Sequence, residues 1–336
     1  MLKGGIIGFG KVGQSMTRII REKFAFADIV AVCNRSQAKL DLARSEFGIE
    51  RLTHDAAELC GWDLDFVMVL SGNRAHRAHV EAAAARRLPI FCEKPIATNV
   101  ADAVAMVRTV EAAGVLNHVN YMLRFLAPFQ EVRRLYREGT LGRLLSVNMT
   151  RLRGFGLYEN GARHWAISDR AESGGWIVHH ACHGIDFAYW LAGEFDTVYA
   201  QTQTTCPGSP ELIWGMGRLK NGATAVVADS VCATRALSVI VVGTRGQVML
   251  NADRDAYLTL TREGRDGGAA VTENIPAVSK PYPAFFEDSL AEFFRCLQSG
   301  SPSSCTLREA YYSLNVAQAM EESAASDRVV KVQACL

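Results

Sequence analysis

The sequence lacks the features that would anchor it in a membrane or attach it to a polyanion. Its 336 residues include 36 basic and 35 acidic side chains, a formal net charge of +1. This balance gives no electrostatic reason to expect binding to nucleic acid or to an anionic membrane. The longest apolar runs, such as 66–70, fall far short of the ~20 residues that a spanning helix needs. We therefore expect a soluble protein.

The sequence also shows no cysteine motif, and we expect no signal peptide. The nine cysteines are scattered singly from Cys33 to Cys335, and no Cys-x-x-Cys spacing indicates a zinc or redox site. The first residues enter a strand pattern directly, without the charged and apolar regions of a signal peptide. These features predict reduced thiols and a cytoplasmic location.

What the sequence does contain is a regular alternation of short apolar and longer amphipathic segments over residues 1–122. The amphipathic segment 10–24, for example, has apolar residues at helical spacing. Strand-length apolar segments lie at 2–8, 29–33, 66–70, 89–92 and 115–121. This alternation predicts a parallel sheet with helices on both faces, as in a Rossmann domain.

The pattern changes after about residue 125. Strand-like stretches then follow one another from 144 to 250, separated by turn signals such as Asn221-Gly222. Adjacent strands without intervening helices indicate a mostly antiparallel sheet. We therefore predict an α/β chain with a Rossmann NAD(P)-binding domain over 1–122. An α+β domain with a large, open sheet follows over 123–336, and its helix near 306–324 is a candidate to pack back on the first domain.

The first predicted strand runs into a glycine motif with the pattern G-x-G-x-x-G. Its residues are Gly8, Phe9, Gly10, Lys11, Val12 and Gly13. In such motifs the first glycine permits a tight turn, and the second lets the backbone approach a pyrophosphate at the helix N-terminus. The third allows close packing of helix and strand. We therefore expect this loop to bind a dinucleotide.

The residues after the second predicted strand bear on the choice of cofactor. An acidic residue about 20 positions after the motif usually holds the ribose 2′-hydroxyl, but Asn34 stands there, followed by Arg35 and Ser36. Arg35 could stack on adenine and bind a 2′-phosphate, to which Ser36 could donate. NADP is therefore favoured over NAD. In the alternative, Arg35 is a solvated loop charge and Asn34 binds a plain ribose.

Glu93-Lys94-Pro95 follows the predicted strand that ends at Cys92. With the glycine motif upstream, it resembles the glucose–fructose oxidoreductase, inositol dehydrogenase and rhizopine-catabolism (Gfo/Idh/MocA) family. Similar segments continue through nearly the whole chain, at 71–76, 121–125, 139–142, 174–175 and 243–246. Each segment is a loose match, but their order and spacing are specific. The resemblance implies an NAD(P)-dependent oxidoreductase of sugars or polyols.

The resemblance also implies residues on the nicotinamide side. The turn at 71–76 would contribute Ser71, Asn73 and His76 to the cofactor site. Lys94 would be the catalytic acid or base, oriented by Glu93. Oxidation of a hydroxyl requires a base for its proton, and a lysine with a lowered pKa suits that role. The alternative is an ordinary surface lysine in a turn.

A second polar cluster extends from His179 to Asp186 on a predicted helix over 175–191. Helical spacing would place one set of residues on a single face: Trp176, His179, His183, Asp186 and Trp190. The family pattern is Asp-x-x-x-His-x-x-Asp, which implies that His183 passes protons with Lys94. His179 replaces the first aspartate, and we expect it to contact substrate, whereas His180 is expected to be structural.

Further candidates to line a sugar pocket are Arg124, Arg163, Trp165 and Trp176, because aromatic faces and planar donors suit polyols. The spacing of His179 and His183 would also suit a metal, with His164, His180 or Cys182 as a third ligand. The glutamate of a His-Glu-x-x-His motif is missing, however, and the cluster already has an explanation. We therefore expect no metal.

These observations predict an enzyme that transfers a hydride between nicotinamide and a hydroxyl or keto carbon of a sugar-like substrate. One alternative is a redox-neutral glycosidase or lyase that oxidises its substrate transiently. Another is a nicotinamide-binding regulator without catalysis, against which Lys94 and His183 argue. Relatives bury the open sheet against a partner, so a homodimer or homotetramer through the C-terminal sheet is expected.

Overall fold

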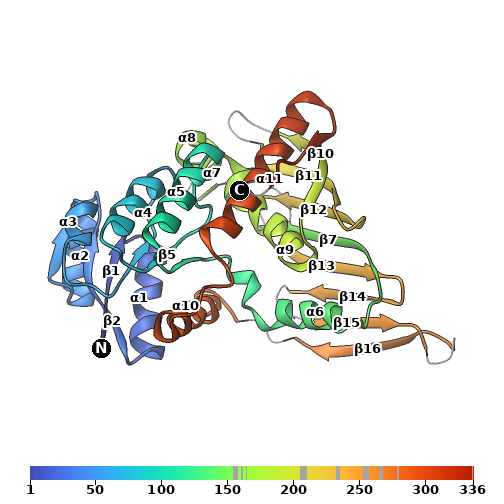
Figure 1. Ribbon diagram of the computed structural model, residues 1–336, viewed down its shortest axis with the longest axis horizontal. Coiled ribbons are helices and arrows are strands. Elements are labelled where there is room, and N and C mark those ends of the chain that lie inside the picture. The colour runs from blue at the N-terminus through green and yellow to red at the C-terminus, as the bar shows by residue number, and fades with distance from the viewer. Residues whose placement is uncertain are drawn as a thin grey trace. The chain divides into compact units, whose positions relative to one another are not determined.

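The computed structural model divides the chain into two compact units (Figure 1). The first unit comprises residues 1–122, 281–311 and 336, and the second comprises 123–280 and 312–335. The structure describes residues 1–153, 165–204, 210–231, 235–252, 257–264, 268–277, 280–334 and 336, and the backbone of 158–159 and 162–163.

A parallel sheet forms the centre of the first unit, which confirms the predicted Rossmann fold. Its strands have the order β3-β2-β1-β4-β5-β6. They are β1 (Leu2–Ile7), β2 (Ala27–Cys33), β3 (Arg51–Thr53), β4 (Phe66–Val69), β5 (Ile90–Cys92) and β6 (Asn117–Val119). The helices of the crossovers are α1 (Lys11–Lys23), α2 (Gln37–Phe47), α3 (Ala56–Cys60), α4 (His76–Ala85) and α5 (Val100–Ala113). All four residues of β4 are buried, as expected for a strand covered on both faces.

The strand order reverses between β1 and β4, which lie side by side. Crossovers on the two sides of such a point leave in opposite directions, and a crevice opens at the carboxyl ends of the strands. The glycine motif follows β1, and the turn beginning at Ser71 follows β4. The fold therefore brings both segments to the edge where dinucleotides bind.

The segment 281–311 completes the core of the first unit, although the predicted division at 122/123 assigned it to the second domain. It contains the short helix η5 (Ala284–Phe286) and α10 (Glu287–Ser299). Four apolar side chains of this segment join the core cluster formed by β1, β2, β4 and α1: Phe286, Leu290, Phe293 and Phe294. Burial of these side chains outweighs sequence proximity, so the first unit is discontinuous along the chain.

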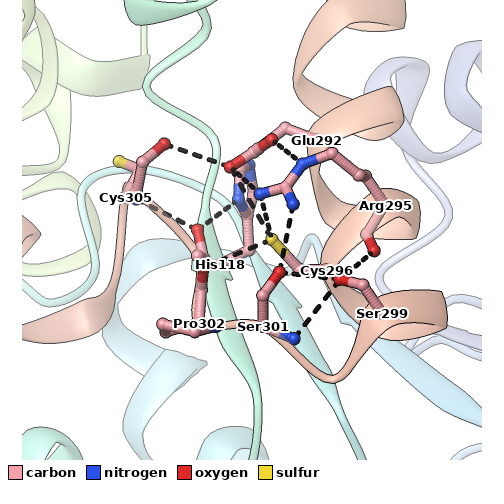
Figure 2. A network of polar contacts seen from close by, with 10 residues as sticks. His118, Glu292, Arg295, Cys296, Ser299, Ser301, Pro302 and Cys305 are labelled. Carbon is pink, nitrogen blue, oxygen red and sulfur yellow. Dashed lines mark hydrogen bonds and ion pairs between the residues drawn. The ribbon is translucent and has the colours of Figure 1, made fainter.

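Polar contacts hold the chain after α10 in place (Figure 2). His118 of β6 contacts the hydroxyls of Ser303 (2.8 Å) and Ser289 (2.9 Å), and its ring stacks on Phe91. Glu292 accepts hydrogen bonds from Arg295 at 2.8 Å and from Ser304 at 3.2 Å. The helix α11 (Leu307–Ser326) follows, with 307–311 in the first unit and its remainder in the second.

A nine-stranded sheet forms the second unit, with the order β16-β15-β14-β13-β7-β12-β11-β10-β17. Its strands are β7 (Leu144–Leu152), β10 (Phe195–Gln203), β11 (Leu212–Leu219), β12 (Thr224–Ser230), β13 (Ala236–Gly243), β14 (Gly246–Asn251), β15 (Tyr257–Arg262), β16 (Val271–Pro276) and β17 (Val330–Lys331). Among the described strands of this sheet, only β7 and β12 pair in parallel. The predicted mostly antiparallel sheet is thereby confirmed.

Helices cover one face of this sheet. The helices and helical turns of the second unit are α6 (Ala127–Arg137), α7 (Trp165–Ser168), α8 (Arg170–Ser173), the π-helical turn η3 (Ile177–Ala181), α9 (Cys182–Ala192) and most of α11. A Cβ built on Gly184 of α9 would lie 2.8 Å from Val227 of β12, so helix and sheet are closely packed. On the other face, Trp214 and Met216 of β11 remain 55% and 51% exposed.

None of the helices in the described ranges combines the length and the apolar character that crossing a membrane requires.

Candidate active site

Two glycines of the predicted dinucleotide loop are required by the fold, and the third is not. Gly8 has a φ of +103°, and a Cβ there would lie 2.5 Å from the backbone nitrogen of Ser71. A Cβ on Gly13 would lie 2.7 Å from the carbonyl oxygen of Gly8. A Cβ on Gly10 would meet no atom within 4 Å. The open space over Gly10, at the N-terminus of α1, therefore fits a pyrophosphate that approaches the backbone.

The loop after β2 is organised by Asn34. Its side-chain oxygen accepts a hydrogen bond from the Ser36 backbone at 2.9 Å, and its carbonyl contacts His54 Nδ1 at 2.8 Å. Arg35 and Ser36 are exposed. Burial, followed by the charges of His76 and Arg35, lowers the pKa of His79 in α4 to about 4. The positive charge of Arg35 therefore acts on His79 of α4, the helix that follows the turn after β4.

His76 links the turn after β4 to the loop that carries Lys94. Its Nδ1 lies 3.0 Å from the carbonyl oxygen of Pro95, and its Nε2 lies 2.9 Å from that of Ser71. The ring is fully buried, and burial lowers its pKa. Asn73 is also buried, and Ser71 Oγ lies 2.8 Å from His79 Nδ1. Through these two contacts, His76 links two loops of the predicted cofactor site.

Glu93 anchors the Lys94 loop with the help of Asn120, a residue that the sequence analysis missed. Asn120 Nδ2 donates to Glu93 Oε1 at 2.5 Å, and the Lys94 backbone donates to Glu93 Oε2 at 3.0 Å. Burial raises the pKa of Glu93, while the charge of Lys94 and these hydrogen bonds oppose that shift. The signal for Asn120 was its place directly after β6, because polar residues at the carboxyl ends of parallel strands face the ligand edge.

In the second unit, a π-helical turn changes the face that each histidine occupies. The sequence analysis placed Trp176 and His179 on one face. In the structure, the Trp176 ring instead stacks on His180 at 4.3 Å, and both are buried. The His179 and Trp165 rings make a T-shaped contact with their centroids 4.7 Å apart, and Trp165 is 39% exposed. The extra residue in a π-helical turn shifts the register of the helix, which explains the difference.

His180 pairs with a second residue that the sequence analysis missed, Asp229 of β12. His180 Nδ1 lies 2.7 Å and 2.9 Å from the two Asp229 carboxylate oxygens. Trp176 Nε1 also donates to Asp229, at 2.7 Å. A lone acidic residue within the apolar segment 224–230 was the available signal, because a buried carboxylate requires partners.

A buried ion pair lies next to His183. Arg124 donates to both carboxylate oxygens of Asp186, at 2.7 and 2.8 Å, and Ser313 donates to one of them at 3.0 Å. Arg124 and Asp186 are almost completely buried. His183 is buried as well, and its ring centroid lies 6.2 Å from that of His180. The Arg124 guanidinium, predicted to contact substrate, is therefore engaged by Asp186.

Some predicted site residues lie outside the described part of the chain, namely His164 and the side chain of Arg163. Among the residues that the structure does describe, no group of three or more His, Cys, Asp or Glu side chains could hold a metal ion.

Comparison with known proteins identifies the family. Residues 2–121 match the Gfo/Idh/MocA oxidoreductase family, NAD-binding Rossmann fold, and residues 133–332 match its C-terminal alpha/beta domain. The chain is 28% identical to D-apiose dehydrogenase of Rhizobium rhizogenes, over 100% of this chain and 99% of that protein. It is 26% identical to inositol 2-dehydrogenase of Acidothermus cellulolyticus, over 97% and 93% of the two chains.

Solved structures agree with this assignment. An oxidoreductase from Agrobacterium radiobacter, in complex with NAD+, L-tartaric acid and magnesium, is 28% identical with a TM-score of 0.87, and the match covers 98% of each chain. Levoglucosan dehydrogenase in complex with NADH has a TM-score of 0.90 at 24% identity, over 99% of each chain, and shows the same fold. With both domains matched and the glycine loop, Lys94 loop and histidine helix in place, the chain belongs to the Gfo/Idh/MocA family of NAD(P)-binding oxidoreductases.

Proposed function

We propose that this oxidoreductase acts on a hydroxyl or keto carbon of a sugar or polyol, with Lys94 as its acid or base and His183 as its partner. The observation that carries the proposal is the anchored Lys94 loop. Glu93 and Asn120 hold that loop at the carboxyl end of β5, on the sheet edge that also bears the glycine motif. Residues for proton transfer and cofactor binding thus come from one edge of one sheet.

The proposed chemistry assigns one proton to Lys94. The glycine loop would hold a nicotinamide dinucleotide, which would supply hydride chemistry at the carbon that bears the hydroxyl or keto oxygen. Lys94 Nζ takes the hydroxyl proton during oxidation and gives it to the keto oxygen during reduction. His183 holds the reacting hydroxyl and exchanges protons with Lys94. Without a base at this position, loss of the hydride would leave a protonated carbonyl, and without an acid the reduction would leave an unprotonated alkoxide.

Support for a sugar-like substrate comes from Trp165 and His179. The Trp165 ring is partly exposed and contacts the half-buried His179, so a flat apolar face lies beside a hydrogen-bonding group. Polyols present both apolar C–H faces and hydroxyls, which such a pair can bind. Relatives named for D-apiose and inositol point to the same class of substrate.

The first experiment follows absorbance at the reduced-nicotinamide band with NADP and NAD, across sugars, polyols, glycosides and their keto forms. We expect a steady, substrate-dependent change. If the cofactor binds but no substrate of the panel changes the absorbance, the redox-neutral glycosidase or the binding regulator is favoured instead. Product analysis on glycosides then separates these two.

The role of Lys94 is tested by Lys94→Ala against Lys23→Ala, a matched change at an exposed lysine of α1. We expect Lys94→Ala to lower kcat by about 10²- to 10⁴-fold, because general acid–base catalysis contributes that much. Its affinity for reduced cofactor should stay native-like, and Lys23→Ala should behave as wild type. Wild-type turnover in a cofactor-binding Lys94→Ala variant would exclude Lys94 as the acid or base.

For the cofactor we propose NADP over NAD, supported by the exposed Arg35 and by Asn34 in place of an acid. Fluorescence titration of NADPH and NADH measures the two dissociation constants. Arg35→Ala should weaken NADPH binding about tenfold and NADH binding by less, because both cofactors carry the adenine but only NADPH carries the 2′-phosphate. Tighter binding of NADH than NADPH by the wild-type protein would contradict the preference.

A further inference from the structure

Asp229 is a carboxylate buried between the sheet and the histidine helix. It is 1% exposed and belongs to β12, on the sheet face that the helices cover. The indole of Trp176 and Nδ1 of His180 both donate to it, at 2.7 Å each. A carboxylate in such surroundings is costly unless hydrogen-bonded, so Asp229 and the turn that supplies its partners depend on each other.

The same turn is held from a second strand. Arg151 of β7 is the register neighbour of Asp229 in the parallel β7–β12 pair, and its Nη1 donates to the carbonyl oxygen of His180 at 3.4 Å. Burial lowers the pKa of Arg151, and the nearby Asp229 carboxylate opposes that shift. β12 therefore holds the side chain of His180, while β7 holds its main chain.

His180 lies within the π-helical turn η3, between the two histidines of the proposed site. The Cys182 backbone donates to the carbonyl of Ile177, five residues back, where an α-helix would use a bond four residues back. π-helical turns are rare and often occur at functional sites. The turn contains His179 and sets the rotation of this residue relative to His183 on α9.

We propose that Asp229 and His180 are positioning residues for the reaction: the Asp229 carboxylate holds His180 Nδ1 and thereby fixes the π-helical turn that presents His179 and His183. The proposal rests on the proposed function, in which His183 exchanges the proton. Without this contact, the turn can return to α-helical bonding, and His179 then rotates about the helix axis relative to His183. A displacement of this kind lowers kcat, because proton transfer depends on alignment within about 1 Å.

The experiment compares Asp229→Asn, His180→Phe and the double variant with wild type, on the substrate and cofactor found in the absorbance assay. Turnover is normalised to the fraction that binds NADPH or NADH in a fluorescence titration. We expect each single variant to lower kcat by about 10- to 100-fold at unchanged cofactor affinity. The double variant should lose no more than the worse single variant, because the two residues act as one unit.

Two further measurements separate positioning from general destabilisation. The ¹⁵N resonances of the His180 ring should show its proton on Nδ1 in wild type and a mixture of tautomers in Asp229→Asn. Ser323→Ala is the matched control, because Ser323 is another buried side chain that links a helix to this sheet, by accepting a hydrogen bond from the Ala200 backbone of β10. It should lower stability and leave kcat unchanged.

If Asp229→Asn does not fold, the proposal is tested by comparing the turnover of His180→Phe with that of His180→Asn. His180→Asn retains a donor near the Nδ1 position and should recover most of the turnover that His180→Phe loses. The proposal is overturned if folded, cofactor-binding variants turn over like wild type, or if the losses of the two single variants multiply. An inactive wild-type protein would instead contradict the proposed function itself, and the positioning role with it.

Discussion

Gly10 is the residue of the dinucleotide loop whose identity the fold alone does not require. A side chain at Gly10 would meet open space. A Cβ at Gly13, by contrast, would lie 2.7 Å from the carbonyl oxygen of Gly8. We propose that the open space over Gly10 admits a ligand, the pyrophosphate of the cofactor.

Gly10→Ala should therefore affect mainly cofactor binding, and Gly13→Ala mainly the free energy of unfolding. We expect Gly10→Ala to change the free energy of unfolding by less than about 1 kcal/mol and to weaken cofactor binding by about tenfold or more. Gly13→Ala should lower the free energy of unfolding by about 1–3 kcal/mol through overpacking. Urea denaturation and fluorescence titration measure both quantities. A Gly10→Ala variant with native cofactor affinity would show that no ligand approaches this residue.

The Arg124–Asp186 pair is the second residue-scale feature with a measurable consequence. Both side chains are almost fully buried, so removal of one partner leaves an uncompensated charge. We expect Asp186→Ala to lower the free energy of unfolding by about 3–5 kcal/mol. The double variant Arg124→Met/Asp186→Leu should recover most of that loss, because it removes both charges together. Equal losses in the single and double variants, measured in urea, would contradict this account.

At the scale of elements, α10 determines whether the first unit has a complete core. Its residue Phe294 packs against Phe24, Phe26 and Phe66, with ring centroids 5.0–5.5 Å apart. The helix lies 218 or more positions along the chain from α1, β2 and β4. No local periodicity links these segments, so the predicted domain boundary could not include 281–311.

Phe294→Ala should lower the free energy of unfolding by about 3–5 kcal/mol, because it leaves a cavity among these rings. Arg295→Ala, at the next position, removes an exposed side chain and should change it by no more than about 1 kcal/mol. Urea denaturation monitored by circular dichroism compares the two variants. Similar small effects in both would show that α10 contributes little to the core.

At the scale of the whole molecule, the sheet face that the helices leave open carries exposed apolar side chains of β11. Trp214 and Met216 lie two positions apart on this strand and share that face, whereas the residues that alternate with them are buried on the face that the helices cover. Contiguous exposed apolar side chains on a sheet mark an interaction surface. We propose that a second copy of the chain covers this face, giving a homodimer or homotetramer.

Trp214→Glu/Met216→Glu should convert the oligomer to monomers of 36.7 kDa in analytical ultracentrifugation, because paired charges cannot be buried in an apolar interface. Tyr282→Glu is the control, since Tyr282 is an equally exposed aromatic side chain in the first unit, at 55%. Sedimentation of the double glutamate variant as the wild-type oligomer would place the interface elsewhere. A monomeric wild-type protein would contradict the oligomer outright.

The sequence by itself determined the Rossmann sheet, the mostly antiparallel second sheet and the family, and the fold and the comparisons with known proteins agree with all three. The binding role of the glycine loop and the role of Lys94 stay predictions. Strand length, helical period and glycine spacing are local properties, so they can be read from neighbouring residues. Only the tertiary structure decided that 281–311 completes the first core and that His180 pairs with Asp229, 49 positions away. Burial and charge compensation depend on which residues are close in space, and the order of residues along the chain does not give those distances.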